Sequence, residues 1–400
     1  MLRLIPPAGT PVRIGDISRA LAAWLVGRDN GQLLTEKLFT LLGDKQFFFV
    51  SSGRVGLYLI LKGLSELSGG KRDEVIIPSY TCFSVAAAIK RAGFKIHPVD
   101  MIAERIDYNY AKLSSEINEK TLAVISCNLF GILSDMDRLR AITTNAGAFL
   151  VDDAAQSFGS LWNGEPSGTI GDAGFISLDR GKNMTAYSGG VIVTGRDDLA
   201  EIIKPSVSEL ARPGMMSNLK TALMLCVYGR LLYPRAYWLP ATLPFLGLGE
   251  TSYNENFGIS RLGSFQLAAA GVNVDQLDTN NRTRKKNAQL LIEALESDQR
   301  YTIAGYRDRS LPVYLRLPLL CKDRNLRDKA LQSLRKNGIQ ASGMYPSIIV
   351  VIPAIESEFD KTAQDFPGGE KIVDRLLVLP THPYLKQRDI LKIVNTLSDL

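Results

Sequence analysis

The segment FISLDRGKNMTAYSGG, residues 175–190, says more about the fold than any other part of this chain. It starts as an apolar strand that ends at Ser177, and Lys182 follows in a predicted loop. Gly189 and Gly190 open the next predicted strand. A lysine just after a strand reaches the crevice where ligands bind at the carboxyl ends of a parallel sheet. Because most lysines are solvated surface residues, spacing alone does not assign it a catalytic role.

A second segment, VDDAAQS at residues 151–157, places acids after an apolar strand. Asp152 and Asp153 follow the apolar strand, and Gln156 lies three residues further on. A carboxylate at this place suits a cationic ring nitrogen or a metal ion, although metal sites recruit further ligands. The alternative is an acidic helix start, which the helix dipole favours.

A third segment, VSSGRVGLYLILKGL at residues 50–64, has small residues before an apolar helix. Backbone N–H groups at such a helix start bind phosphate. The alternative is that one of the serines, Ser51 or Ser52, simply caps the helix. The chain has neither a Gly-x-Gly-x-x-Gly fingerprint nor a P-loop, which disfavours ordinary dinucleotide or ATP binding.

Strand and helix patterns alternate around these segments, which predicts an α/β sheet with crossover helices. Ser134 is the predicted N-cap of one of these helices. The predicted strands are residues 74–81, 94–100, 121–131, 148–157, 171–178 and 189–195, and the helices are 84–93 and 134–147.

The pattern of helices and strands changes after residue 260, and the new pattern predicts a smaller α+β domain. Helical periodicity covers residues 261–297. Strand-like runs at 302–306 and 311–320 and helices at 328–338 and 387–400 follow. We therefore predict a large domain at 1–250 and a small C-terminal domain at 251–400.

An apolar, proline-rich segment at 219–250 interrupts the large domain. Its longest uncharged piece, residues 236–249, is too short and too broken by proline to span a bilayer. The favoured prediction is an inserted helical hairpin that packs on the protein or on a partner subunit. The alternative is a membrane-surface contact, with Arg230 and Arg235 near lipid headgroups.

The composition of the 400 residues is that of a globular protein, with 46% hydrophobic and 22% charged residues. A net charge of +6 favours a small anionic ligand and does not argue for nucleic acid. Four scattered cysteines and two histidines supply neither a metal site nor a Ser-His-Asp triad. The N-terminus has no apolar run of signal-peptide length, so the cytoplasm is the expected compartment.

A phosphate-type turn, an acidic loop and a strand-exit lysine, in this order, resemble the fold type I pyridoxal-phosphate enzymes. More closely, the chain resembles the DegT/StrS family of nucleotide-sugar aminotransferases. The resemblance extends from SSGRVGL at 51–57 to RLLVLPTHPYL at 375–385, and its most specific part is residues 152–190. It implies a large domain with a mostly parallel seven-stranded sheet flanked by helices, and a smaller α+β C-terminal domain.

The resemblance also implies roles around pyridoxal 5'-phosphate. Lys182 matches the lysine that condenses with the cofactor's aldehyde and then moves the substrate proton. Asp153 matches the carboxylate that pairs with the pyridine nitrogen. Gln156 matches the residue near the phenolic oxygen, and Ser177 matches a hydroxyl that donates to the phosphate. Gly53 and Arg54 match the helix-start amides beneath that phosphate.

Three positions depart from the family pattern. Cys82 stands where an aromatic residue usually stacks on the cofactor, so either Cys82 packs against the ring or Phe83 or Tyr80 supplies the aromatic face. Asn128 replaces a frequent histidine. Ile259 replaces an asparagine that usually reaches the partner subunit's phosphate, and Asn254 and Asn256 are the possible substitutes.

The implied reaction moves an amino group from an amino acid, with glutamate the expected donor, to a nucleotide-linked keto sugar. A homodimer is expected, with no nucleic acid and no resident metal. One alternative is a non-catalytic scaffold or regulator that binds the cofactor. The other is a sugar dehydratase of the same family; such enzymes replace the lysine with histidine, so Lys182 disfavours it. The sugar, its ring position and the pathway stay open.

Overall fold

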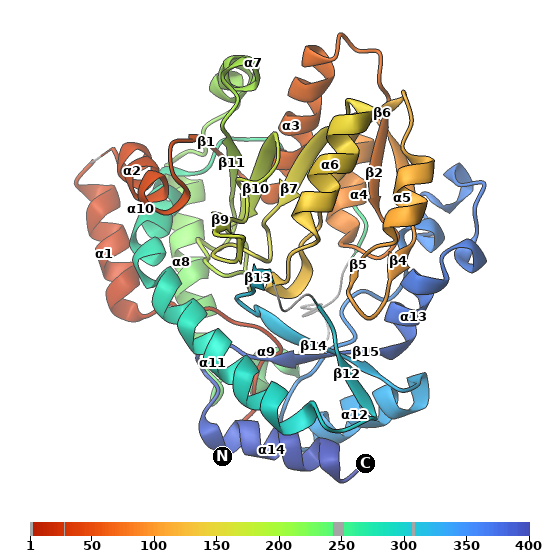
Figure 1. The fold of residues 1–400 in the computed structure, drawn as a ribbon. Coiled ribbons are helices and arrows are strands. Elements are labelled where there is room, and N and C mark those ends of the chain that lie inside the picture. Colours follow the sequence, from red (N-terminus) through yellow and green to blue (C-terminus); the bar gives the residue numbers. More distant parts are fainter. Residues whose placement is uncertain (1–2, 28, 243–251, 306–308) are drawn as a thin grey trace.

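The computed structural model describes residues 3–27, 29–242, 252–305 and 309–400 (Figure 1). Its centre is a seven-stranded sheet in the order β1-β11-β10-β7-β6-β2-β3. The strands from β10 to β3 are parallel, and β11 runs antiparallel to both of its neighbours. The strands are β1 (Gln46–Val50), β2 (Glu74–Pro78), β3 (Lys95–Val99), β6 (Thr121–Ile125), β7 (Phe149–Asp153), β10 (Ala173–Ser177) and β11 (Gly190–Thr194).

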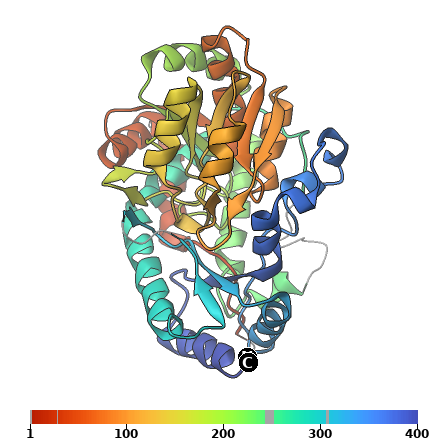
Figure 2. The same cartoon turned by 45° about the vertical axis from the view of Figure 1, so that its right-hand side comes forward.

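Helices cover both faces of this sheet (Figures 1 and 2). Val75 and Ile77 of β2 pack in the same apolar cluster as residues of α3 (Gly53–Leu67) and α4 (Phe83–Arg91). Ile76, between them, packs with Leu139 of α6 (Met136–Ala146) on the opposite face. Because successive strand residues point to opposite faces, an uninterrupted apolar strand is the pattern of a parallel sheet that is buried on both sides.

The structure confirms the predicted α/β class and places a strand in each segment predicted as one, with one addition to the central sheet, although the predictions at 121–131 and 148–157 run past the ends of β6 and β7. The edge strand β1 was not predicted, because QFFFV joins directly to the turn at Ser51–Gly53 and reads as part of one apolar stretch. It pairs with β11 through all five of its residues.

The predicted N-cap of α6 is wrong by one residue. Asp135, and not Ser134, caps the helix by accepting a hydrogen bond from the backbone N–H of Arg138. The hydroxyl of Ser134 instead donates to the carbonyl of Ser126 at 2.8 Å. Ser134 therefore ties the helix to the end of β6, a contact that sequence spacing does not reveal.

The C-terminal part contains the three-stranded antiparallel sheet β12-β14-β15 (lower half of Figure 1). Its strands are β12 (Tyr301–Ile303), β14 (Arg316–Cys321) and β15 (Leu376–Pro380). The predicted strand at 311–320 starts late, because Tyr314 has a positive φ of 46° that interrupts an extended chain. β15 lies in the RLLVLP segment and was not predicted as a strand.

The remaining helices surround both sheets. They are α1 (Ile14–Leu25), α2 (Asn30–Leu42), α5 (Tyr110–Glu116), α7 (Asp197–Glu209), α8 (Met215–Leu231), α9 (Trp238–Ala241), α10 (Ser264–Asn273), α11 (Leu277–Leu295), α12 (Arg324–Lys336), α13 (Pro367–Arg375) and α14 (Gln387–Ser398). Short strands complete the fold: β4 (Met101–Ile102), β5 (Asp107–Tyr108), β8 (Leu161–Trp162), β9 (Glu165–Pro166) and β13 (Ser310–Leu311).

The boundary at residue 250 stays a prediction. The helix α10 follows that boundary in the sequence, yet it packs on α1, α2 and α8. The segment at 219–250 does not form a hairpin over its described residues, since α8 is one long helix and α9 a single turn. Residues 243–250 of that segment lie outside the described residues. Within the described ranges, no helix is long and apolar enough to cross a membrane.

Candidate active site

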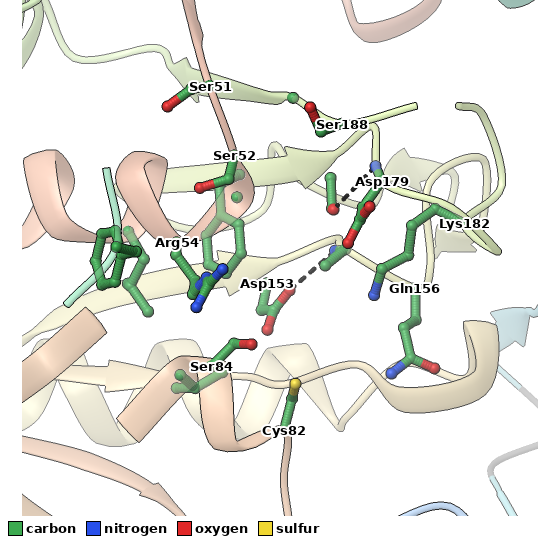
Figure 3. Close-up of a pocket in the computed structure, with 18 of the residues that line it drawn as sticks. Ser51, Ser52, Arg54, Cys82, Ser84, Asp153, Gln156, Asp179, Lys182 and Ser188 are labelled. Carbon is green, nitrogen blue, oxygen red and sulfur yellow. Dashed lines mark hydrogen bonds between the residues drawn. The ribbon is translucent and has the colours of Figure 1, made fainter. Parts of the chain in front are cut away.

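A cavity of about 500 Å³ opens at the carboxyl ends of the central strands (Figure 3). The ends of β7 and β10, the lysine loop after β10, and the starts of α3 and α4 supply its walls. All seven predicted site residues line it: Gly53, Arg54, Cys82, Asp153, Gln156, Ser177 and Lys182. Segments far apart in the sequence meet here because parallel strands present their carboxyl ends at one edge of the sheet.

Lys182 and Asp153 face the same space. Figure 3 shows the Lys182 amine and the Asp153 carboxylate reaching into the cavity from neighbouring segments. The loop that carries Lys182 is closed at its base, where the N–H of Leu178 donates to the carbonyl of Gly189 at 2.9 Å. The N–H of Ala186 also donates to the carbonyl of Leu178 at 2.9 Å, so backbone bonds set the position of the loop.

Asp153 is buried, and its carboxylate accepts a hydrogen bond from the N–H of Ala155. Burial raises its pKa from an ordinary 3.8 to about 6, although the N–H of Ala155 and the charge of Lys182 act in the opposite direction. The bond from Ala155 to its carboxylate is 2.9 Å long. A cation next to such a group lowers its pKa and stabilises the ionised form. The site therefore suits a positively charged ligand group.

Asp152, one residue earlier, points into the protein interior and is bonded on several sides. It accepts hydrogen bonds from the N–H groups of Gly168 at 2.6 Å and Ile170 at 3.3 Å. The amide of Asn128 donates to it at 2.8 Å. Its pKa also rises to about 6, because burial outweighs these bonds. Asn128, where the family often has histidine, thus fixes Asp152 while it lines the cavity.

The start of α3 is both capped and open to a ligand. Ser52 caps it by accepting from the N–H of Val55 at 3.3 Å. The N–H groups of Gly53 and Arg54 belong to the first turn, where a helix offers no internal acceptors. A Cβ at Gly190 would lie 2.5 Å from the backbone of Ser52, so only glycine lets β11 pass this close to the helix start.

Cys82 is the residue that faces the cavity among the three alternatives for the cofactor's ring face. Figure 3 shows its sulfur near the Asp153 side of the cavity. Phe83 is buried and stacks on Tyr345 with ring centroids 6.3 Å apart. The hydroxyl of Tyr80 is taken by the backbone, since it donates to the carbonyl of Gly343 and accepts from the N–H of Tyr345.

Gln156 is held in one orientation. Its amide nitrogen donates to the Tyr345 hydroxyl at 2.9 Å, and its oxygen accepts from the N–H of Phe130 at 3.2 Å. Ile259 and Ser260 line the same cavity near Ser51, whose N–H donates to the carbonyl of Ser260. Ile259 therefore occupies the cavity wall, and the expected contact to a partner subunit's phosphate stays a prediction.

Sequence reasoning missed two supports of the lysine loop. The Tyr228 hydroxyl, on α8, accepts a hydrogen bond from the N–H of Gly181 at 3.1 Å. The Thr10 hydroxyl donates to the carbonyl of Lys182, and the buried Arg284 donates to that hydroxyl at 2.7 Å. No signal identifies them, because Thr10 lies 172 residues before Lys182 and Tyr228 lies in the apolar segment.

The model of the DegT/DnrJ/EryC1/StrS aminotransferase family matches residues 14–398. The chain belongs to this family. Membership confirms the predicted class of enzyme, an aminotransferase. It also confirms pyridoxal phosphate as the cofactor, since transamination needs an electron sink that protein side chains lack.

Members with known names and structures cover most of the chain. A pleiotropic regulatory protein of Geobacillus stearothermophilus is 29% identical over 82% of this chain and 79% of its own length. The dTDP-3-amino-3,4,6-trideoxy-alpha-D-glucose transaminase of Streptomyces venezuelae is 26% identical over 88% and 81%.

Solved structures share the fold. The sugar aminotransferase CalS13 from Micromonospora echinospora superposes with a TM-score of 0.78 at 22% identity and covers 100% of both chains. Helicobacter pylori PseC, an aminotransferase involved in the biosynthesis of pseudoaminic acid, gives 0.80 at 17% identity and covers 99% of both chains. These comparisons confirm the predicted fold of this DegT-family chain.

Proposed function

We propose that this protein moves an amino group from an amino acid, glutamate in the simplest case, to the keto group of a nucleotide-linked sugar. The observation that carries the proposal is the shared cavity of Lys182 and Asp153. Bound pyridoxal phosphate would supply an aldehyde that takes up the amino group and a ring that accepts the electron pair left at the donor's Cα.

The residues of the cavity fit that cofactor. Asp153 would hold a protonated ring nitrogen, whose positive charge would offset the effect of burial on the pKa of Asp153. The first amides of α3 and the hydroxyl of Ser177 hold the phosphate, because helix starts bind anions. Lys182 would provide the amine that attaches the cofactor and would then carry the proton of the donor's Cα. Cys82 and Gln156 border the remaining space.

The nucleotide-linked sugar is supported by relatives and by charge. Two relatives are named for activity on such sugars, the Streptomyces venezuelae transaminase above and the UDP-2-acetamido-2-deoxy-3-oxo-D-glucuronate aminotransferase of Pseudomonas aeruginosa. Arg54 and Arg180 lie at the cavity and would attract the diphosphate of a nucleotide sugar. A homodimer and a cytoplasmic location remain part of the proposal.

Mass spectrometry tests this function. The holoprotein is incubated with ¹⁵N-glutamate and a panel of nucleotide-linked keto sugars, and each sugar is examined for a gain of one labelled nitrogen. We expect one sugar to acquire the label and the visible absorption of the protein to bleach with glutamate alone. A protein that stays colourless with added cofactor contradicts the proposal.

A regulator that binds the cofactor without turnover is the second candidate, because the Geobacillus relative is named as a pleiotropic regulatory protein. This alternative predicts a coloured protein whose absorption does not bleach with any amino donor. The dehydratase alternative predicts turnover without an amino donor, and the presence of Lys182 in the cavity argues against it.

A further inference from the structure

The helix α8 has an inner face that packs on the protein. Its buried positions are Asn218, Ala222, Leu225 and Gly229, which recur every three to four residues and so form one face. This face meets α10 and α1. A Cβ at Gly229 would lie 2.8 Å from the carbonyl of Val12, so the helix sits directly against the N-terminal segment.

The opposite side of α8 is apolar as well, although it is exposed. Met216 is 77% exposed, Leu219 45%, Leu223 63% and Val227 42%. Their spacing of three to four residues aligns them in one stripe, which we call the outer face of α8. Figure 1 shows α8 next to α10, outside the central sheet. A helix that is apolar all round is normally covered on every side, so this face calls for an apolar partner.

Positive charge accompanies this apolar stripe without any negative charge. Between Glu209 and Glu250 the sequence has no acidic residue. It has four cationic residues in that interval, all of them exposed: Arg212, Lys220, Arg230 and Arg235. By helical spacing, Lys220 and Arg230 lie on the same side of α8 as the outer face. Long cationic side chains there cover apolar surface with their stems and keep their charges in water.

Exposed aromatic and aliphatic residues continue beyond the end of α8. Tyr233 is 50% exposed, Trp238 of α9 is 42% exposed and Leu239 is 44% exposed. Tyrosine and tryptophan are enriched where a membrane meets water, because their rings are apolar and their polar tips are hydrated. The combination of an apolar stripe, cationic residues and aromatic residues is that of a helix lying on a lipid surface.

We propose that the outer face of α8 docks the enzyme on a membrane surface that contains anionic lipids. This inference is independent of the sugar on which the enzyme acts. A second copy of the chain fits the face poorly, because a symmetric dimer would bring the same cationic patch against itself with no acid in the segment to pair it. Anionic headgroups supply the missing negative charge.

Vesicle sedimentation of the full-length holoprotein tests the proposal. We expect the protein to sediment with vesicles of equal parts phosphatidylglycerol and phosphatidylcholine at low salt and to remain in the supernatant with phosphatidylcholine alone. The double variant Leu223→Glu/Val227→Glu should lower the affinity at least about tenfold, because it puts charge into the exposed apolar stripe that would enter the lipid. Lys220→Gln and Arg230→Gln should each lower it about fivefold.

The matched control puts two acids on exposed leucines elsewhere. Leu311→Glu/Leu391→Glu changes residues on β13 and α14 that are 59% and 57% exposed, and it should bind vesicles like the unchanged protein. Failure of the unchanged protein to sediment, or an equal loss in both double variants, overturns the proposal. It is also overturned if Leu223→Glu/Val227→Glu converts a lipid-free dimer to a monomer, because a second copy would then cover the face. Cofactor absorption checks that every variant is folded.

Discussion

Two adjacent regions of the molecule, the interior behind the cavity and the cavity wall, each contain an aspartate, and the two aspartates have opposite surroundings. Behind the cavity, Asp152 is buried and accepts hydrogen bonds from Gly168, Ile170 and Asn128. On the cavity wall, Asp153 accepts one from Ala155 and otherwise faces the open space that Lys182 shares. The alternation of a strand accounts for the contrast, because successive residues point to opposite sides.

The contrast suggests different roles for the two residues: Asp152 stabilises the fold, and Asp153 is available to a ligand. Asp152 in the interior has its hydrogen bonds made, and an unmade hydrogen bond there would cost about 1–3 kcal/mol. Asp153 on the cavity wall instead accepts one hydrogen bond from the protein, and its burial disfavours the ionised form until a cationic ligand group pairs with it. Each of the following changes tests one side of this division.

The largest expected effect is that of Lys182→Ala. Removing the amine abolishes covalent attachment of the cofactor and lowers amino transfer by at least about a thousandfold, because the proton carrier is lost with it. Borohydride reduction followed by peptide mass analysis measures the attachment, and labelled-nitrogen transfer measures the rate. Lys182→Arg is the control that keeps the charge. Unchanged transfer in Lys182→Ala would contradict the assignment.

Asp153→Asn is expected to lower the rate by roughly a hundred- to a thousandfold, the usual cost of one lost electrostatic contact in an active site. Because burial of the Asp153 charge costs the fold stability at neutral pH, its replacement should raise the thermal stability of the cofactor-free protein at pH 7. Steady-state kinetics and thermal melts report the two quantities separately. A large drop in stability with normal kinetics would place Asp153 with the interior residues.

The pH dependence of unfolding probes the same carboxylate. Its folded pKa of about 6 exceeds the ordinary 3.8, so between these values the folded cofactor-free protein binds more protons than the unfolded chain. The free energy of unfolding should therefore fall as pH rises from 4 to 6, by up to about 3 kcal/mol from this group. Urea titrations across that range measure it. The Asp153→Asn variant should lack this part of the decline. An equal decline in both proteins would show that Asp153 is not its source.

Asp152→Asn is expected to act on stability. An amide has only one carbonyl oxygen, so it leaves some of the donors around Asp152 without an acceptor and lowers the free energy of unfolding by about 1–3 kcal/mol. Chemical denaturation measures this change. The rate per folded, cofactor-loaded molecule should change far less than in Asp153→Asn. Equal losses of rate in Asp152→Asn and Asp153→Asn would contradict the distinction between the interior and the cavity wall.

The smallest expected effect is that of Tyr228→Phe, which removes the acceptor of the Gly181 N–H beside the catalytic loop. The loss of one such bond costs about 0.5–1.5 kcal/mol, and we expect a several-fold decrease in rate with the cofactor still attached. Tyr233→Phe, at an exposed tyrosine beyond α8, is the control and should behave as the unchanged protein. An equal decrease in rate in both variants would contradict a specific role of Tyr228 in holding the lysine loop.

Local patterns predicted much of the central sheet. The apolar runs that became β2, β6 and β10 are buried on both faces, and such strands are visible from composition alone. The strands β1 and β15 were not predicted, because their short apolar runs merge with neighbouring segments. The cap of α6 was misplaced by one residue, since Ser134 and Asp135 are both good capping residues and only the contact with Ser126 distinguishes them.

The sequence by itself indicated the kind of chemistry through its resemblance to the DegT/StrS family, because the phosphate-type turn, the acidic loop and the strand-exit lysine occur in the family's order, although no one of them decides it alone. Only the tertiary structure showed that Asp152 is enclosed by hydrogen bonds behind the cavity, and that Cys82 rather than Phe83 or Tyr80 borders it. It also revealed the support of the lysine loop by Thr10 and Tyr228. Spacing along a chain governs strands and helices, whereas contacts between distant segments depend on how those elements pack.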